Sequence, residues 1–363
     1  MKLFTVGPVE MEKYIRDKGG EPIPYFRTAE FSKIMLEIQE HFLRLLDAPT
    51  GAKLVPLTAS GTGAMEAAVL NVLTAEDKCL IIDGGSFGHR FTEICSMHGI
   101  PFECLKLRFG ERLKEKHLEA FDNKEITALL VNIDETSTAQ LYDYRMLGKF
   151  CKRNNAIYII DSISSFLADP FSMRQGNVDV FITSSQKALA LPPGLSFIVL
   201  SPKIIKERIG KSRKRTYYFD FENYLLNMER GQTPFTPAVG ILLQLQLRLE
   251  EICKNGIESE IAKHRERAET FRKLCVETGI KLPEYPMSNA VTAILFPKGN
   301  ATNVFHIMKN TYGMMLTPNG GELRDIVLRV GHMGDLKLTD YQELIKDLDY
   351  AIKDSLTSEL FNP

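Results

Sequence analysis

Residues 156–161, Ala156-Ile157-Tyr158-Ile159-Ile160-Asp161, form an apolar run that ends in a carboxylate. A run that is apolar throughout, with no polar alternation, indicates a strand covered on both faces. Similar runs occupy residues 79–83, 126–133, 178–183 and 195–200, with amphipathic helical segments between them, among them 63–73 and 144–154. This order predicts an α/β fold with a mostly parallel sheet between helices. Right-handed crossovers would bring the loops after the strands to one edge of the sheet.

The pattern changes after about residue 255. A Leu-rich helix is expected over 238–253, followed by a charged, solvent-facing connector helix over 257–277. Strand-like segments at 290–295 and 326–330, a helix at 303–312 and a closing amphipathic helix then indicate a smaller C-terminal α+β domain. We therefore expect an N-terminal segment, 1–20, that packs with the small domain, a large domain, 21–255, and a small domain, 256–363.

The composition excludes several classes of protein. Of 363 residues, 45 are Lys or Arg and 46 are Asp or Glu, with no long run of one sign, so no surface for nucleic acid or an anionic membrane is expected. Six scattered cysteines form no Cys-x-x-Cys pair and do not cluster with the seven histidines, which predicts reduced thiols and no metal site. No apolar run approaches the roughly 18 residues of a membrane span. These features favour a cytoplasmic enzyme.

A Gly-rich segment, Ser60-Gly61-Thr62-Gly63, follows the apolar residues 54–57 and opens a helix. Glycines let backbone amides approach an anion, the hydroxyls add donors, and a helix N-terminus adds partial positive charge, so a phosphate would fit here. The segment is not a Walker loop, and Glu66 stands where a dinucleotide fingerprint needs a third glycine. Taken alone, it is equally consistent with an ordinary capped turn.

Two charged residues stand at the ends of predicted strands. Asp161 would face the ligand crevice, where a semi-buried carboxylate needs a cationic partner, although an isolated Asp in this place is also consistent with a helix cap. Lys187 lies 26 residues further on, among small residues and before the turn Pro192-Pro193-Gly194. Desolvation would make it a nucleophilic amine, whereas an isolated Lys in a sequence is most often a solvated side chain. The order of phosphate cup, Asp and Lys is the set of groups that pyridoxal phosphate (PLP) requires.

At this point the sequence resembles the class V, fold type I PLP-dependent aminotransferases over nearly its whole length. The motifs that carry the resemblance are Ser60-Gly61-Thr62-Gly63-Ala64, Asp161-Ser162-Ile163-Ser164-Ser165, Ser185-Gln186-Lys187-Ala188-Leu189 and Leu328-Arg329-Val330-Gly331. The resemblance implies that Lys187 is the Schiff-base lysine and Asp161 the partner of the ring nitrogen. It implies a phosphate cup of Ser60, Gly61, Thr62 and Gln186.

The same resemblance suggests roles for five further residues. Phe87 would stack on the ring, the alternative being a core aromatic. Thr136 would lie near the ring oxygen, and Arg329 would bind the substrate α-carboxylate through two parallel donors. Arg27 is a candidate for the substrate site. Thr233, or else Thr236, would reach the phosphate of a second subunit in a homodimer with shared active sites, the alternative being a purely structural Pro-rich turn.

The chain departs from the family pattern at several positions. It has no Trp, Ala139 replaces a glycine, and Ile133-Asp134 stands where His-Gly is usual, which places a carboxyl beside the ring. Phe26 and Ala29 replace the His and Pro that flank Arg27 in the family.

The resemblance implies a ping-pong aminotransferase that moves an amino group from a small donor to a 2-oxo acid such as pyruvate or glyoxylate. The quoted motifs are similar to those of alanine–glyoxylate, serine–pyruvate and 2-aminoethylphosphonate–pyruvate aminotransferases, and no residue selects among these donors. A desulfurase-like lyase would need a reactive Cys shortly before Arg329, and residues 316–324 contain none. A non-catalytic PLP-fold binding protein is the other alternative, and the joint presence of Lys187, Asp161 and Arg329 argues against it.

Overall fold

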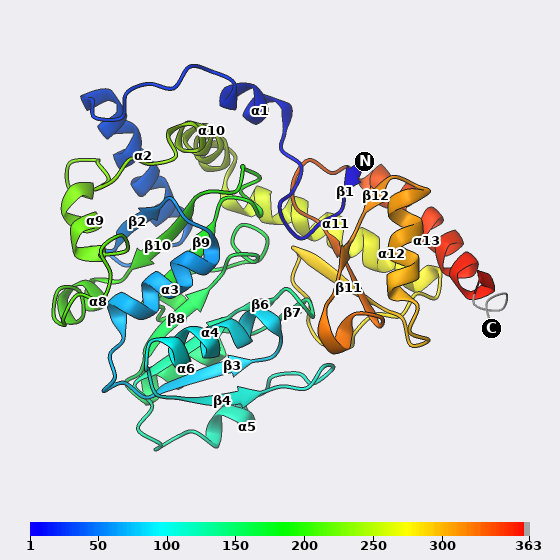
Figure 1. Cartoon of the computed structure of the whole chain (residues 1–363), viewed down its shortest axis with the longest axis horizontal. Coiled ribbons are helices and arrows are strands. Elements are labelled where there is room, and N and C mark those ends of the chain that lie inside the picture. Colours follow the sequence, from blue (N-terminus) through cyan, green and yellow to red (C-terminus); the bar gives the residue numbers. More distant parts are fainter. Residues whose placement is uncertain (359–363) are drawn as a thin grey trace.

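The computed structural model describes residues 1–358, and its largest element is a seven-stranded sheet (Figure 1). In spatial order the strands are β2 (Lys53–Leu57), β10 (Ser196–Leu200), β9 (Val180–Ser184), β8 (Ile157–Asp161), β5 (Ala128–Asn132), β3 (Cys79–Asp83) and β4 (Phe102–Lys106). β10 is antiparallel to both of its neighbours, and the other neighbouring pairs are parallel. The predicted α/β fold with a mostly parallel sheet is confirmed.

Helices cover both faces of this sheet, because alternate strand residues pack in opposite directions. Ile159 of β8 belongs to the core under α3 (Gly61–Val72), α4 (Ser86–Met97) and α9 (Phe221–Met228). Its neighbour Ile160 belongs to the core under α2 (Ala29–Leu45), α6 (Tyr144–Arg153) and α10 (Val239–Asn255). Burial on both sides explains why these strands are apolar throughout.

A second, three-stranded antiparallel sheet lies in the C-terminal part of the chain, in the order β11 (Val291–Leu295), β14 (Val327–Gly331) and β13 (Thr317–Pro318). It packs with α11 (Ile257–Glu277), α12 (Ala301–Asn310) and α13 (Leu338–Ser358) around a separate apolar core. α11 was expected to face solvent, but one side of it is buried and includes Ile261, His264 and Phe271. The buried side also includes a charged residue, Glu260, so charge along this helix did not by itself indicate exposure to solvent.

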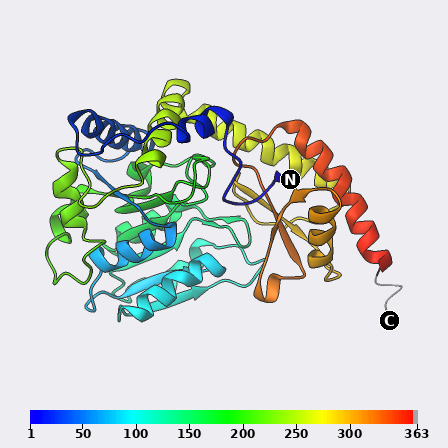
Figure 2. The same cartoon turned by 45° about the horizontal axis from the view of Figure 1, so that its top comes forward.

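The N-terminal segment contacts both parts of the molecule. β1 (Lys2–Leu3) pairs in parallel with β12 (Met314–Met315), beside the smaller sheet (Figures 1 and 2). α1 (Lys13–Gly19) lies on α10, where Gln244 Nε2 donates to Ile15 O at 2.8 Å. The residues between β1 and α1 therefore run from the smaller sheet to the helices of the larger one.

The remaining elements are short. They are α5 (Glu115–Glu119), β6 (Asp134–Glu135), β7 (Gln140–Leu141), α7 (Met173–Gly176), α8 (Pro202–Glu207) and the 3-10 helix Gly321–Leu323. β6 and β7 pair with each other just beyond the end of β5. Within residues 1–358, no helix is both long and apolar enough to span a bilayer.

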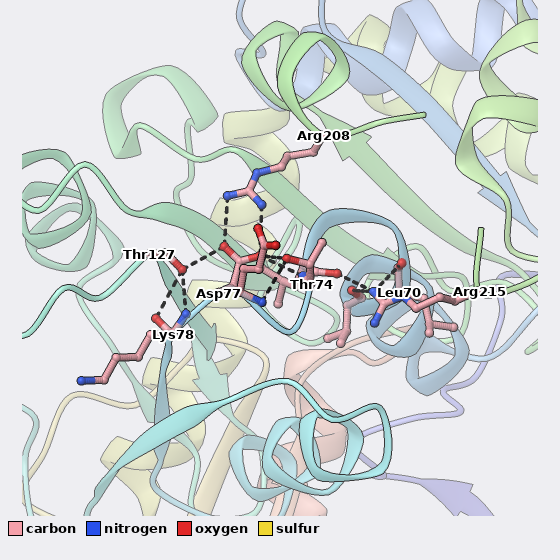
Figure 3. Close-up of polar contacts among 10 residues, drawn as sticks. Leu70, Thr74, Asp77, Lys78, Thr127, Arg208 and Arg215 are labelled. Carbon is pink, nitrogen blue, oxygen red and sulfur yellow. Dashed lines mark hydrogen bonds and ion pairs between the residues drawn. The ribbon is translucent and has the colours of Figure 1, made fainter. Parts of the chain in front are cut away.

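A buried polar cluster around Asp77 lies at the C-terminal end of α3, the end opposite its Gly-rich start (Figure 3). The Asp77 carboxylate accepts both Arg208 Nη groups at 3.0 Å and Thr127 Oγ1 at 2.9 Å. Burial acts to raise the pKa of Asp77, but the hydrogen bonds from Thr74 N, Arg208 and Thr127 outweigh it and hold that pKa below its usual range. Arg215 donates to the carbonyl oxygens of Val69 and Leu70 in the last turn of α3. These hydrogen bonds fix the C-terminal end of the helix.

Candidate active site

Lys187 lies in the turn that follows β9, and its side chain is almost entirely enclosed, with 8% of the residue exposed. Its Nζ donates to the carbonyl oxygen of Val6, which belongs to the N-terminal segment. Ser185 stabilises the turn, since its hydroxyl donates to Pro192 O at 2.6 Å. Burial lowers the pKa of Lys187 to about 8, against the opposing influence of Asp134 and Asp161. A neutral amine is therefore accessible close to neutral pH.

Asp161 is the last residue of β8, in the centre of the sheet, where it is level with Asn132 of β5 and Ile182 of β9. It is 4% exposed, and within the described chain its carboxylate accepts one hydrogen bond, from Ile163 N at 2.8 Å. Burial raises the pKa of Asp161 to about 7, while Ile163 N–H and Lys187 act to lower it. A cation at this carboxylate would favour its ionised form.

The Gly-rich segment is the N-terminus of α3, at the same edge of the sheet. Ser60 is the N-cap, and its Oγ accepts from Gly63 N at 3.2 Å. Gly61 packs so closely that a Cβ there would lie 2.3 Å from Ile163 Cδ1, in the loop after β8. Ser60 and Thr62 are exposed, and the first amides of a helix have no intrahelical acceptor. Thr62 Oγ1 accepts from Arg90 Nη1 at 3.1 Å, which adds a cation beside the cup.

Glu135 holds the first turn of α4, which carries Phe87. Its buried carboxylate accepts from Gly88 N at 2.8 Å and from Phe87 N at 3.3 Å, in the first turn of α4. A carboxylate in this position is favoured by the helix dipole and positions the half-buried Phe87 ring. The Arg90 guanidinium lies 4.9 Å from the centroid of that ring.

Arg329 reaches the site from the smaller sheet, on β14. The residue is 7% exposed, and its guanidinium donates to Thr136 O at 3.0 Å and to Pro318 O at 2.8 Å. Its Nε is buried without a partner in the described chain. Burial lowers the pKa of Arg329 to about 10, although the charges of Glu135 and Asp134 act to raise it. The guanidinium therefore stays cationic at neutral pH and has a free donor.

Thr136 and Gln186 stand close to these groups. Thr136 is buried, and its Oγ1 lies 2.8 Å from Ser164 Oγ. Gln186 is half-buried and directly precedes Lys187 in the chain. The roles of Thr136 and Gln186 toward a ligand stay predictions.

A cavity of about 880 Å³ opens between the two sheets. Its lining includes Phe87, Ser137, Asn319 and Arg329, with Lys106 and His89 among the charged or titratable residues. Asn319 Nδ2 donates to Ser137 O at 2.7 Å and so joins the smaller part of the chain to this wall. The cavity has room for a small substrate beside Arg329.

Two predicted residues lie together but apart from this cluster. Arg27 is exposed, and its guanidinium donates to Thr233 O at 2.7 Å and to Gln232 Oε1 at 3.1 Å. Thr233 is buried, and its hydroxyl donates to Phe235 O at 2.7 Å. Within residues 1–358, neither side chain forms a hydrogen bond to Lys187, Asp161 or Arg329.

Sequence reasoning missed the contributions of Val6 and Gly7, which lie against the Lys187 side chain. A Cβ on Gly7 would lie 2.7 Å from Lys187 Cδ. The sequence signal was weak, because these residues are some 180 positions away and form no regular element. The helix-capping role of Glu135 was also missed, although Glu135 directly precedes Thr136 in the sequence.

Known proteins resemble this chain over most of its length. The profile of the family described as Aminotransferase class-V matches residues 10–323. The chain is 30% identical to the soluble hydrogenase 42 kDa subunit of Anabaena cylindrica over 345 residues, which cover 93% of this chain and 88% of that protein. It is also 30% identical to an L-aspartate–glyoxylate aminotransferase of Paracoccus denitrificans over 346 residues, covering 92% and 86%. Among solved structures, an aspartate aminotransferase of subgroup IV from Thermus thermophilus superposes with a TM-score of 0.88 at 25% identity, covering 98% and 99%.

Proposed function

This chain belongs to the class V aminotransferases, and from that membership we propose that it moves the amino group of a small donor to a small 2-oxo acid. The donor would be of the alanine, serine or 2-aminoethylphosphonate type, and the acceptor pyruvate or glyoxylate. The proposal is carried by Lys187, Asp161 and Arg329, which are all buried, with Asp161 and Arg329 both acting electrostatically on Lys187. The relative from Paracoccus denitrificans, whose name includes glyoxylate, supports that acceptor.

The residues of the site fit PLP, the cofactor of this family. Ser184 Oγ is buried without a partner in the described chain, and it lies 3.4 Å from the position of a Cβ on Gly61. The Asp161 carboxylate accepts one hydrogen bond, and burial raises its pKa. Both features are expected of a carboxylate that pairs with a cationic ring nitrogen. When bound, PLP supplies an aldehyde for the amine and a ring that withdraws electrons from the substrate α-carbon.

Each protein group then has one task. The amides of Gly61 and Thr62 and the hydroxyl of Ser60 would bind the phosphate, and Gln186 would contribute a further donor. Asp161 would pair with the positive charge of the ring nitrogen, and Phe87 would stack on the ring. Thr136 would be a further ligand of the ring.

Lys187 and Arg329 act on the substrate. Arg329 binds the α-carboxylate through its two-pronged guanidinium, which orients the donor. Lys187 Nζ takes and returns the α-proton, a task for which an amine with a pKa of about 8 is suited near neutral pH. Enclosure of Lys187 and Arg329 excludes water from these charges and strengthens their interactions.

We also propose a homodimer with shared sites. Ile23, Tyr25, Tyr217 and Leu226 are more than 60% exposed, which is unusual for large apolar side chains unless another surface covers them. Tyr217 contacts Phe235, 5.5 Å between ring centroids, beside the Thr233 segment that would reach the second subunit. In this proposal Arg27 acts by holding that segment through Thr233 O, as well as being a candidate for the substrate site.

The proposal extends to domain organisation and location. A boundary near residue 255, between a domain of residues 21–255 and one of residues 256–363, is supported by the core that Phe4 and residues beyond 270 form at the smaller sheet. Other residues of that sheet, among them Val291 and Ala293, pack into the core of the larger sheet. The 1–20 segment is assigned to the smaller part through β1, although α1 lies on α10. Six free cysteine thiols support a cytoplasmic location.

A spectral half-reaction screen tests the function. Candidate donors are added to the holoenzyme one at a time, and the visible absorption of the cofactor is followed before and after addition of pyruvate or glyoxylate. We expect a small donor to discharge the band and the oxo acid to restore it, with Lys187→Ala inactive and Lys152→Ala, an exposed control on α6, unchanged. A wild-type spectrum that no amino donor alters, or full turnover by Lys187→Ala, would overturn the proposal.

A further inference from the structure

The N-terminal segment passes the strand that carries Arg329 before it reaches the site. Phe4 N donates to Met315 O at 2.9 Å, and Phe4 O accepts from Gly331 N, two residues after Arg329 on β14, at 2.8 Å. The segment lies so close to this strand that a Cβ on Gly331 would be 2.1 Å from Thr5 O. The segment therefore enters the site from a fixed place on the smaller sheet.

Val6, the next residue but one, forms hydrogen bonds on both of its sides. Its N–H donates to Thr317 Oγ1 at 3.1 Å, and its carbonyl oxygen accepts from Lys187 Nζ. Thr317 belongs to β13 and lies directly opposite Arg329 in the antiparallel pair of β13 and β14. A single residue therefore joins the buried amine to the cross-strand neighbour of the arginine.

The direction of the Val6 carbonyl depends on contacts rather than on local backbone preference. Gly7 follows it with a φ of +121°, and the wide conformational freedom of glycine leaves the peptide group between the two residues weakly restrained. The Thr5 hydroxyl closes the turn around this peptide by donating to Pro8 O at 2.5 Å. Thr317 fixes the other side of Val6, which is 5% exposed. Without the Thr317 hydroxyl, a buried N–H would lose its acceptor, and rotation of Val6 toward another acceptor would be favoured.

The two functional side chains depend on this link to different degrees. The Arg329 guanidinium donates to Thr136 O and to Pro318 O, and neither bond involves Val6 or Thr317. For Lys187 Nζ, Val6 O is the one hydrogen-bond acceptor within the described chain. Loss of the Thr317 hydroxyl should therefore act on the amine and leave the guanidinium in place.

We propose that Thr317 is a positioning residue for Lys187, whose hydroxyl holds the Val6 peptide so that its carbonyl faces the amine. The proposal rests on the proposed role of Lys187 and adds a residue that acts on the amine through the backbone of Val6. It also means that the sheet that carries Arg329 helps to set the direction of the amine.

Chemical labelling of the apoenzyme tests the inference without any need for activity. Acetic anhydride acetylates only the neutral amine, and the rate at Lys187 is measured by peptide mass spectrometry, with the exposed Lys152 in the same digest as reference. In Thr317→Val, which keeps the shape and removes the hydroxyl, we expect Lys187 to react about fivefold faster, because a hydrogen bond that favours the charged amine is lost. Thr317→Ser keeps the hydroxyl and should react like the wild type. Thr311→Val, at an exposed threonine after α12, is the matched control and should also react like the wild type.

Steady-state kinetics of the holoenzyme separate positioning of the amine from substrate binding. In Thr317→Val we expect kcat with an amino donor to fall about tenfold, because the amine that moves the proton is less well oriented. KM for the donor should stay within about twofold of the wild-type value, because Arg329 keeps its own acceptors. Thr317→Ser should restore kcat. A raised KM with an unchanged kcat would mean that the hydroxyl serves donor binding instead, and would overturn the inference.

The outcomes separate this inference from the proposed function. If folded Thr317→Val labels at the wild-type rate, or if Thr317→Ser labels like the valine variant, the inference is wrong even if Lys187 binds the cofactor. Should the valine variant not fold, hydrogen exchange of the wild-type apoenzyme decides. Protection of the Val6 amide equal to that of the Phe4 amide supports the inference, and an unprotected Val6 amide overturns it. If labelling rises and serine restores it while no cofactor attaches to Lys187, the function fails and the inference stands.

Discussion

Replacing Gly7 by alanine should disturb the site from the N-terminal segment. The Gly7 φ is +121°, a conformation that L side chains rarely adopt, and a Cβ there would lie 2.7 Å from Lys187 Cδ and 3.0 Å from Nζ. Ordinary contacts begin at about 3.4 Å, so the Lys187 side chain or the segment must move, and the bond from Nζ to Val6 O is lost. Backbone strain and one charge-assisted hydrogen bond together amount to about 2–4 kcal/mol of unfolding free energy.

Two measurements on Gly7→Ala check this reasoning. Denaturant unfolding of the apoenzyme gives the stability loss, and titration with PLP, followed by visible absorption, should show affinity reduced about tenfold or more. Gly313→Ala is the matched control, because φ is +65° there and no atom lies within 4 Å of the added Cβ. It should lose about 1 kcal/mol through strain and keep its affinity for PLP. Equal PLP affinities in the two variants would refute the claim that this segment positions Lys187.

Three further changes probe other parts of the site. Arg329→Lys should lower kcat/KM for the amino donor about 10²–10³-fold while leaving the cofactor spectrum intact, since one ammonium cannot replace a two-pronged guanidinium; an unchanged kcat/KM in steady-state assays would refute its role. Gly61→Ala, whose Cβ would lie 2.3 Å from Ile163 Cδ1, should weaken PLP binding about tenfold in a fluorescence titration, and tight binding would contradict the phosphate cup. Asp161 should contribute a fall in the melting temperature of the apoenzyme as pH rises from about 4 to about 7, because burial raises its folded pKa from 3.8 to about 7 and stability is lost as its proton leaves. Asp161→Asn should remove this contribution, so that its melting temperature relative to wild type rises over this range, and an unchanged difference would contradict the assignment.

The strands that bear the site were predictable because they are buried on both faces. The run 156–161 corresponds to β8 (Ile157–Asp161), and 79–83 coincides with β3 (Cys79–Asp83). Hydrophobic pattern carries no information on strand direction, so the antiparallel course of β10 could not be foreseen. β4 (Phe102–Lys106) lies at the edge of the sheet, where three of its five residues are only half-buried, and no strand was predicted there.

The polar residues of the candidate site were predictable where they stand at the ends of strands. Asp161 ends β8, and Lys187 follows β9. These two strands are parallel neighbours, so both residues lie at the same edge of the sheet. Contacts between distant, irregular segments left no local signal. Two hydrogen bonds are of this kind. Lys187 Nζ donates to Val6 O, and the Arg27 guanidinium donates to Thr233 O.

PLP is expected to be attached to the amine of Lys187. The holoenzyme is reduced with borohydride, which makes the link between cofactor and protein permanent, and the pyridoxyl group is located by peptide mass spectrometry. We expect the added mass on Lys187 alone. Its appearance on a different lysine, or its absence from a protein fully reconstituted with PLP, would contradict the assignment of the site.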